Sequence, residues 1–109
     1  MNPLIAMVFR DGDKIIVQGP VTIDNVVQLT REGMALFDDH RLTIDLNKVT
    51  EVDSTIISML LEWLRATRKN IYPLQFINMP ESLKSLIQLY DVVELILVPD
   101  NQTVDQGAA

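Results

Sequence analysis

The sequence has no cysteine and a single histidine, His40, and these two gaps remove most catalytic and metal chemistry. Without cysteine the chain has no disulfide framework, no thiol nucleophile and no cysteine zinc cluster. One histidine at a predicted helix-to-strand junction has no evident way to serve as the base for a serine nucleophile. Glycine is also scarce, and no GxGxxG or GKS/T phosphate loop occurs. We therefore expect no enzyme activity, no cofactor and no metal site.

Positive charge is in short supply, and long apolar runs are missing. Nine Lys and Arg residues against fifteen Asp and Glu give the 109-residue chain a formal charge of −6. That is the wrong sign for attraction to nucleic-acid phosphates or to an anionic membrane surface. No stretch reaches about 18 apolar residues, and the N-terminus has neither a basic nor an apolar leader. We therefore predict a cytoplasmic protein that binds no nucleic acid and does not insert directly into a membrane.

Hydrophobic residues make up 48% of the chain, which is enough for one folded core. An Asp-Gly pair between two short β-rich runs predicts a hairpin, and the alternation of Leu42, Ile44 and Leu46 predicts a later strand. Elsewhere, apolar residues recur at helical spacing. We expect, in order, strands over 4–9 and 14–18, a helix over 22–39, a strand over 42–46, a loop over 47–53, a helix over 54–69, a strand over 74–77, a helix over 80–90 and an apolar segment over 92–98.

Helices that alternate with single strands imply crossover connections onto one sheet. The predicted fold is therefore a single α/β domain over residues 1–98, with a mixed sheet of four to five strands packed with three to four helices. Residues 99–109 show no periodicity, and we expect them to form a flexible C-terminal tail.

The segment Glu51-Val52-Asp53-Ser54-Thr55 joins the predicted strand to the central helix and holds two hydroxyl groups. The simplest interpretation of Ser54 is an N-cap, whose hydroxyl accepts a hydrogen bond from a free N–H of the first turn. The same position suits phosphorylation of Ser54 or Thr55, because an added phosphate meets free N–H groups and a favourable helix dipole. The residues leave both interpretations open.

The helix over 54–69 carries an apolar arc of roughly 200°, whereas a helix resting on one sheet needs only somewhat more than about 100°. One explanation is that neighbouring helices and the tail cover the excess. The other is that Met59 and Trp63, residue types favoured in interface cores, contact another protein. Leu60 and Leu64 lie in the middle of the arc, and we assign them to the core.

Residues 42–55, LTIDLNKVTEVDST, resemble the signature of STAS domains, the family of bacterial anti-sigma factor antagonists. In that signature an apolar strand ends in Asp-Leu, and a short loop leads to Val/Ile-Asp-Ser/Thr, then Ser/Gly and Gly, at the start of a long helix. Gly19, the pair Leu60-Leu61 and the segment 86–90 also stand where the family has its landmarks. The resemblance covers roughly residues 4–98 and implies the STAS fold.

Within the family, the freestanding size, the leucine-rich central helix and the pair Leu89-Tyr90 are most similar to the STAS subunits of Mla-type intermembrane phospholipid transporters. The resemblance implies a non-enzymatic protein that binds and supports the ATPase subunit of an inner-membrane ABC transporter, and that is peripheral to that membrane through its partner. The alternative that it implies is an anti-sigma factor antagonist, which an anti-sigma factor kinase phosphorylates on Thr55 or Ser54. A sensor of a lipid or other small ligand is a third class.

Ile56 stands where the family has glycine, and we expect its bulk to obstruct a kinase while leaving the docking of a partner open. The resemblance places the hydroxyl that follows the aspartate, Ser54 in this chain, at the partner contact. The predicted contact lies on the first half of the central helix, with the aspartate shaping the loop before it. It consists of Asp53, Ser54, Thr55, Ser58, Met59 and Glu62.

Overall fold

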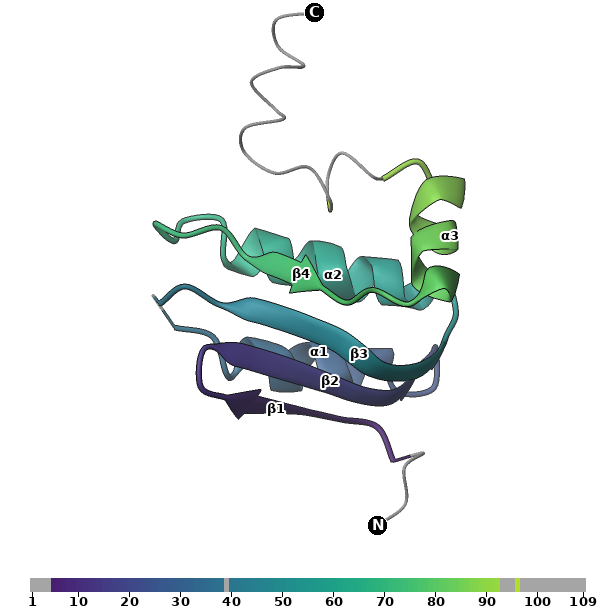
Figure 1. The fold of residues 1–109 in the computed structure, drawn as a ribbon, viewed down its shortest axis with the longest axis horizontal. Coiled ribbons are helices and arrows are strands. Elements are labelled where there is room, and N and C mark those ends of the chain that lie inside the picture. The colour runs from purple at the N-terminus through teal and green to yellow at the C-terminus, as the bar shows by residue number, and fades with distance from the viewer. Residues whose placement is uncertain (1–4, 39, 93–95, 97–109) are drawn as a thin grey trace, which may run out of the picture.

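The computed structural model describes residues 5–38, 40–92 and 96 of the chain (Figure 1). Within that part, strands and helices follow one another in the predicted order, and the prediction of a single α/β domain with a mixed sheet is confirmed. The predicted tail over 99–109 lies outside the described residues, as does most of the apolar segment over 92–98. The elements are β1 (Met7–Asp11), β2 (Lys14–Val21), α1 (Val26–Met34), β3 (Thr43–Val52), α2 (Thr55–Ala66), β4 (Gln75–Ile77) and α3 (Glu81–Leu89).

The strands lie in the order β1-β2-β3-β4, with β1 antiparallel to β2 and the other two pairs parallel. The hairpin turns at Gly12 and Asp13, and Gly12 has a φ of 65°, which favours glycine. Parallel neighbours need crossover connections, and α1 and α2 supply them. Both helices lie behind the sheet in Figure 1 and cover the same face, while α3 lies at the end where β3 finishes.

Strand β3 continues to Val52, so the prediction of a loop over 47–53 is wrong. The pairing of β3 with β2 is interrupted by two register shifts, one between Ile16 and Gln18 of β2 and one between Gly19 and Pro20. Each shift places an extra residue in β3, which breaks the alternation of buried and exposed side chains that identifies a strand in a sequence. The strand therefore carries the chain ten residues along the sheet to the start of α2.

Trp63 fills the space between α1 and α2, and it is fully buried. Its Nε1 donates a hydrogen bond to the Thr30 carbonyl oxygen at 3.0 Å, and the Phe37 ring meets it edge-on, with centroids 5.9 Å apart. Gly33 of α1 permits this approach, because a Cβ atom there would lie 2.3 Å from Cζ2 of Trp63. Met59 is fully buried as well. The prediction that Met59 and Trp63 contact a partner is therefore wrong, since α1 and the sheet cover them.

The uncovered part of the apolar arc lies on the other flank of α2. Leu60 is fully buried, as predicted, whereas Leu61 and Leu64 pack against the core but stay half-buried. The two leucines line a shallow hollow together with Arg65 and Arg68. The arc is thus wide because α2 contacts both the sheet and α1, and its surplus faces this hollow.

Candidate functional site

The candidate site lies where β2 and β3 end side by side. Val21 is paired with Val52, and the Asp53 N–H donates a hydrogen bond to the Val21 carbonyl oxygen at 3.3 Å. Because neighbouring parallel strands end at the same edge of the sheet, the segments that lead into α1 and α2 start next to each other. This edge brings residues 22–27 and 53–58 together, at the end of the molecule where β3 passes into α2 (Figure 1).

Asp53 joins these two segments through both of its carboxylate oxygens. Oδ2 accepts a hydrogen bond from the Ile23 N–H at 2.9 Å, while Oδ1 accepts one from the Thr55 N–H at 3.0 Å and one from the Thr55 hydroxyl. The Thr55 hydroxyl bond, together with the two backbone N–H groups, lowers the pKa of Asp53 below its usual value. Asp53 is therefore a carboxylate at neutral pH that fixes the start of α2 against the segment before α1.

Ser54 occupies the N-cap position but does not cap the helix with its side chain. Its φ of −64° and ψ of −17° are helical, whereas a capping side chain needs an extended backbone to fold back onto the first turn. Asp53 takes over that task from the preceding position. The expectation that the Ser54 hydroxyl satisfies a first-turn N–H is therefore wrong, and the exposed Ser54 side chain is left for other contacts.

The other two hydroxyl groups are held by local hydrogen bonds. Thr55 is half-buried and donates to Asp53, and Ser58 is exposed and donates to the Thr55 carbonyl oxygen at 2.8 Å. A carboxylate with a lowered pKa is a poor base, so it does not activate a hydroxyl as a nucleophile. His40, the only imidazole, lies before β3 and is separated from Ser54 by the length of that strand, about 30 Å for ten residues.

Spacing along α2 arranges the predicted contact residues in two groups. Ser54, Ser58 and Glu62 recur every fourth residue, so they follow one exposed or half-exposed stripe of the helix. Met59 lies on the opposite, buried face. Glu62 at the end of the stripe is within 3.6 Å of Arg65. The structure thus brings five of the six predicted residues to one surface and assigns Met59 to the core.

Two exposed hydrophobic residues of this surface were missed by the sequence reasoning. Ile23 is 68% exposed and Val27 is 61% exposed. The Val26 N–H donates to the Thr22 carbonyl oxygen, so this turn is already helical and Val27 follows Ile23 on the same side. The sequence did contain a signal that Ile23 is exposed, because this residue stands between polar residues in a turn. No such signal marked Val27 as exposed, because the sequence does not show which of two adjacent valines in an amphipathic helix faces outward.

Ile56, in contrast, is fully buried. The expectation that its side chain obstructs a kinase is therefore wrong, because the side chain is buried in the core. The segments that form the site carry several acidic residues, with Asp24 just before α1 and Glu51 and Asp53 just before α2. A partner that docks here is expected to present basic groups.

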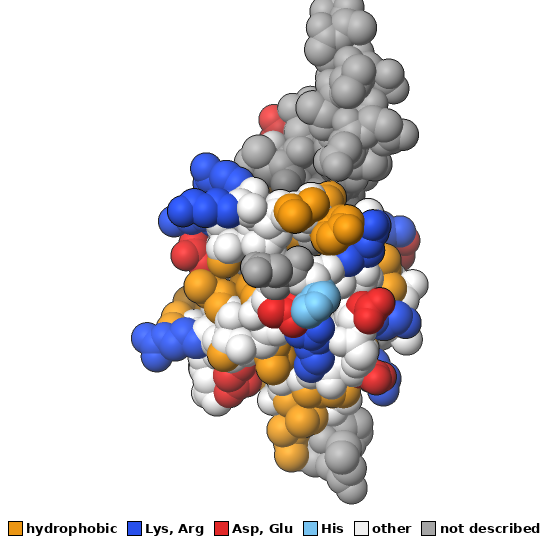
Figure 2. Space-filling model, turned by 90° about the vertical axis from the view of Figure 1, so that its left-hand side faces the viewer, with side chains coloured by type: hydrophobic (Ala, Val, Ile, Leu, Met, Phe, Trp, Pro, Cys, Tyr) orange, Lys and Arg blue, Asp and Glu red, His pale blue; other side chains and the backbone are white. Residues whose placement is uncertain are grey.

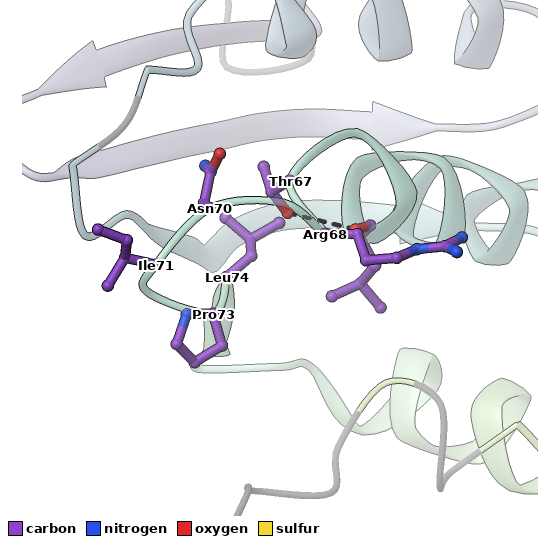
Figure 3. A pocket seen from close by; sticks show the side chains of 7 residues that line it. Thr67, Arg68, Asn70, Ile71, Pro73 and Leu74 are labelled. Atoms are coloured by element: carbon purple, nitrogen blue, oxygen red, sulfur yellow. Dashed lines mark hydrogen bonds between the residues drawn. The ribbon is translucent and has the colours of Figure 1, made fainter.

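Among the described residues, no group of three or more His, Asp or Glu side chains is placed to hold a metal ion. No helix in the same part of the chain is both long and apolar enough to cross a bilayer. Two hollows of the described surface lie toward the far end of α2. One of them, about 270 Å³, is lined by Leu64, Thr67, Arg68, Asn70, Ile71, Pro73 and Leu74 (Figure 3).

Comparison with known proteins gives a matching family and 13 similar chains of solved structures. The family model described as "Mlab, STAS domain" matches residues 9–99. A chain of the "Acinetobacter MlaFEDB complex in ATP-bound Vtrans2 conformation" has a TM-score of 0.73 at 23% identity, covering 85% of this chain and 99% of that one. The anti-sigma factor antagonist SpoIIAA in its unphosphorylated form has a TM-score of 0.64 at 9% identity, covering 95% of this chain and 96% of that one. No curated protein sequence matches.

Proposed function

Because the chain belongs to the STAS domain family, we propose that it is a non-enzymatic subunit that binds the ATPase of a Mla-type phospholipid ABC transporter at the cytoplasmic side of the inner membrane. The description of the matching family model supports this choice, and so does the likeness to a chain of the MlaFEDB complex. The observation that carries it is the exposed Ser54, whose capping role Asp53 has taken.

The contact, which we call the docking surface, consists of Ile23, Val27, Ser54, Ser58 and Glu62. Its two aliphatic side chains provide apolar area that a partner removes from water. The hydroxyl groups of Ser54 and Ser58 supply hydrogen bonds beside that area. Asp53 and Thr55 lie underneath and hold the two segments in register. Acidic residues around the surface favour a basic patch on the ATPase.

A matched pair of isoleucine substitutions tests the docking surface. Ile23→Asp places a charge in the contact, whereas Ile71→Asp makes the same change at the far end of α2, where the side chain is 87% exposed. Calorimetric titration against the purified Mla-type ATPase of the same organism is expected to show affinity weakened about tenfold or more by Ile23→Asp, since burying an aliphatic side chain contributes about 1.5–3 kcal/mol. Ile71→Asp is expected to bind like the unmodified protein.

Equal binding by both variants would show that the ATPase does not bind at the docking surface. Failure of the unmodified protein to bind the ATPase in the presence or absence of ATP would contradict the proposed function itself. Circular dichroism melting of both variants serves as the control for folding, because both side chains are exposed and their replacement should leave stability nearly unchanged.

An anti-sigma factor antagonist is the second candidate, and the buried Ile56 favours it. With that side chain in the core, no bulk stands at the helix start to hinder a kinase. Ser54 suits phosphorylation better than Thr55, because the Thr55 hydroxyl is half-buried and donates to Asp53. Incubation with host lysate and ATP is then expected to add one phosphate, measured by intact mass and lost in Ser54→Ala or Thr55→Ala. An unmodified mass across growth conditions would count against this candidate.

A further inference from the structure

The turn between α2 and β4 exposes two large hydrophobic side chains at the end of the molecule opposite the docking surface. Ile71 is 87% exposed and Tyr72 is 41% exposed. Three basic residues surround them, and with them form what we call the loop patch. The loop patch consists of Arg41, Arg68, Lys69, Ile71 and Tyr72.

Contacts link four of these residues in pairs, and Lys69 follows Arg68 directly in the chain. The Arg41 guanidinium lies over the Tyr72 ring, 4.4 Å from its centroid. Arg68 and Ile71 line the same hollow of about 270 Å³, whose floor includes Leu64 and Leu74, so apolar surface continues from Ile71 toward α2 (Figure 3). Figure 2 looks at this end of the molecule and shows hydrophobic side chains with Lys or Arg side chains on either side of them.

Hydrogen bonds hold the turn in this form. The Asn70 side chain donates to the Asp38 carbonyl oxygen at 3.1 Å, and the Asn70 N–H donates to the Thr67 carbonyl oxygen at 3.0 Å. Thr67 is buried, and its hydroxyl donates to the Trp63 carbonyl oxygen at 3.0 Å. On the other side of the turn, the Gln75 N–H donates to the Leu42 carbonyl oxygen at 3.4 Å, so the turn is anchored at both ends and holds Ile71 outward. The exposure of Ile71 therefore follows from the fold of the turn. Apolar surface in contact with water is unfavourable in free energy, and a second surface that covers the side chain would remove this cost.

The charges of the loop patch are available to a ligand. Within the described part of the chain, Arg41, Arg68 and Lys69 form no ion pair, whereas Arg10 and His40 nearby both contact the Asp38 carboxylate. The acids around the docking surface lie at the other end of α2, which is about 18 Å long for its twelve residues. At physiological salt that separation exceeds the screening length of about 8 Å, so only local charges act on a ligand at the loop patch. At this end the acids Asp11, Asp13 and Asp38 are outnumbered by the basic residues, which are Arg10, Lys14, Arg41, Arg68 and Lys69.

We propose that the loop patch rests on the headgroup region of an anionic membrane, with Ile71 and Tyr72 in the interface and the three basic side chains on lipid phosphates. A short loop with two exposed hydrophobic side chains offers little contact area to a rigid protein surface, but a lipid interface deforms around it. Tyrosine prefers the level of the headgroups, and Lys and Arg extend their charges to the phosphates. The contact is interfacial, so it requires no membrane-spanning helix.

This contact goes beyond the binding of an ATPase and does not depend on it. Because the docking surface and the loop patch lie at opposite ends of α2, a partner protein and a membrane can occupy them together. The two contacts would then reinforce each other, since a protein held near the bilayer by its partner meets the lipid at a high local concentration. The whole-chain charge of −6 does not reveal this region, because it sums over the entire chain and does not show where the basic side chains gather.

Cosedimentation of the purified protein with lipid vesicles tests the proposal. At low ionic strength, binding is expected to vesicles of phosphatidylglycerol and phosphatidylcholine but not to phosphatidylcholine alone, and high salt is expected to weaken it. Arg68→Gln with Lys69→Gln should reduce partitioning about 25-fold, since each basic residue near an anionic surface contributes about fivefold. Lys48→Gln with Lys84→Gln is the matched control, because it removes the same charge away from the loop patch and should leave binding unchanged.

A fluorescent side chain reports the depth of Ile71. In an Ile71→Trp variant the emission of the new tryptophan is expected to shift to the blue on anionic vesicles, whereas Ile23→Trp, at the docking surface, is expected to show no shift. Absence of cosedimentation with anionic vesicles at low salt would overturn the proposal and assign the loop patch to an acidic protein segment. Equal loss of binding in the two charge pairs, or equal shifts in the two tryptophan variants, would overturn it as well. None of these outcomes depends on whether the protein binds an ATPase.

Discussion

Replacement of Gly33 by alanine sets two effects against each other: the higher helix propensity of alanine, and the close contact of position 33 with the Trp63 ring. In an isolated helix, alanine is more favourable than glycine by about 1 kcal/mol. In this structure the added Cβ would lie 2.3 Å from Cζ2 and 2.6 Å from Cε2 of Trp63, a buried ring that cannot move away without disturbing the core. Overpacking of this kind costs about 1–3 kcal/mol and opposes the helix preference. We expect Gly33→Ala to lower the free energy of unfolding by about 0–2 kcal/mol, although glycine-to-alanine replacement stabilises an isolated helix.

Urea denaturation followed by circular dichroism measures this change, and a melting temperature lowered by about 4–8 °C for each kcal/mol checks it. Trp63→Leu supplies the second arm of a double-mutant cycle, because a smaller side chain leaves room for the Cβ atom that Gly33→Ala adds. We expect Gly33→Ala to be less destabilising in the Trp63→Leu background, with a coupling of about 1–3 kcal/mol. A Gly33→Ala variant more stable than the unmodified protein, or a coupling near zero, would refute the packing of α1 on α2 described above.

Further changes test the core and the start of α2. Met59→Ala should destabilise the isolated protein by about 2–5 kcal/mol in urea titration, because the side chain is fully buried. A change below about 0.5 kcal/mol would contradict the burial of Met59. Ser54→Ala should change stability by less than about 0.5 kcal/mol, since its side chain makes no capping bond, and a loss near 1 kcal/mol would show that it does cap. Asp53→Asn should lose about 1–2 kcal/mol at neutral pH, because its carboxylate accepts two N–H bonds and the Thr55 hydroxyl. The pKa of Asp53 is lowered, so its stabilisation is present above the usual aspartate pKa and is lost as the pH falls through the folded-state value; melting temperatures of Asp53→Asn and the unmodified protein should converge in acid. Asp38→Asn should behave in the same way, since hydrogen bonds from His40 and Arg10 lower the pKa of Asp38 to about 2. The gap in melting temperature should shrink as the pH falls from 4 toward 2, and a gap at pH 2 as large as at neutral pH would contradict this account.

Most of the fold followed from the sequence because its elements are defined locally. The Asp-Gly pair and the period-two alternation of Leu42, Ile44 and Leu46 placed the hairpin and the central strand correctly. The register shifts of β3 were not predictable, because a bulge is specified by the partner strand as much as by the strand itself. Gly19 shows the same limit, since a Cβ there would lie 2.8 Å from the Ile5 carbonyl oxygen of a neighbouring segment.

The candidate site was located from the sequence, but the roles of its residues were not. The order Asp53-Ser54-Thr55 placed hydroxyl groups at the start of a helix. Which side chain caps that helix depends on φ and ψ at Ser54 and on the Ile23 N–H, which arrives from a distant segment. The family resemblance pointed to the same residues, and the match over 9–99 confirms the family while leaving the partner to experiment.

The sequence by itself determined the order of strands and helices, the acidic character of the chain and the wide apolar arc of its central helix. Only the tertiary structure decided which side of that helix is covered, because the answer depends on Gly33 and Trp63 meeting across thirty residues of chain. Folding also placed Arg41 over Tyr72 and brought both next to Arg68 and Ile71, which lie about thirty residues away from Arg41 in the chain. Periodicity is a property of neighbours along the backbone, whereas burial and local charge are properties of neighbours in space.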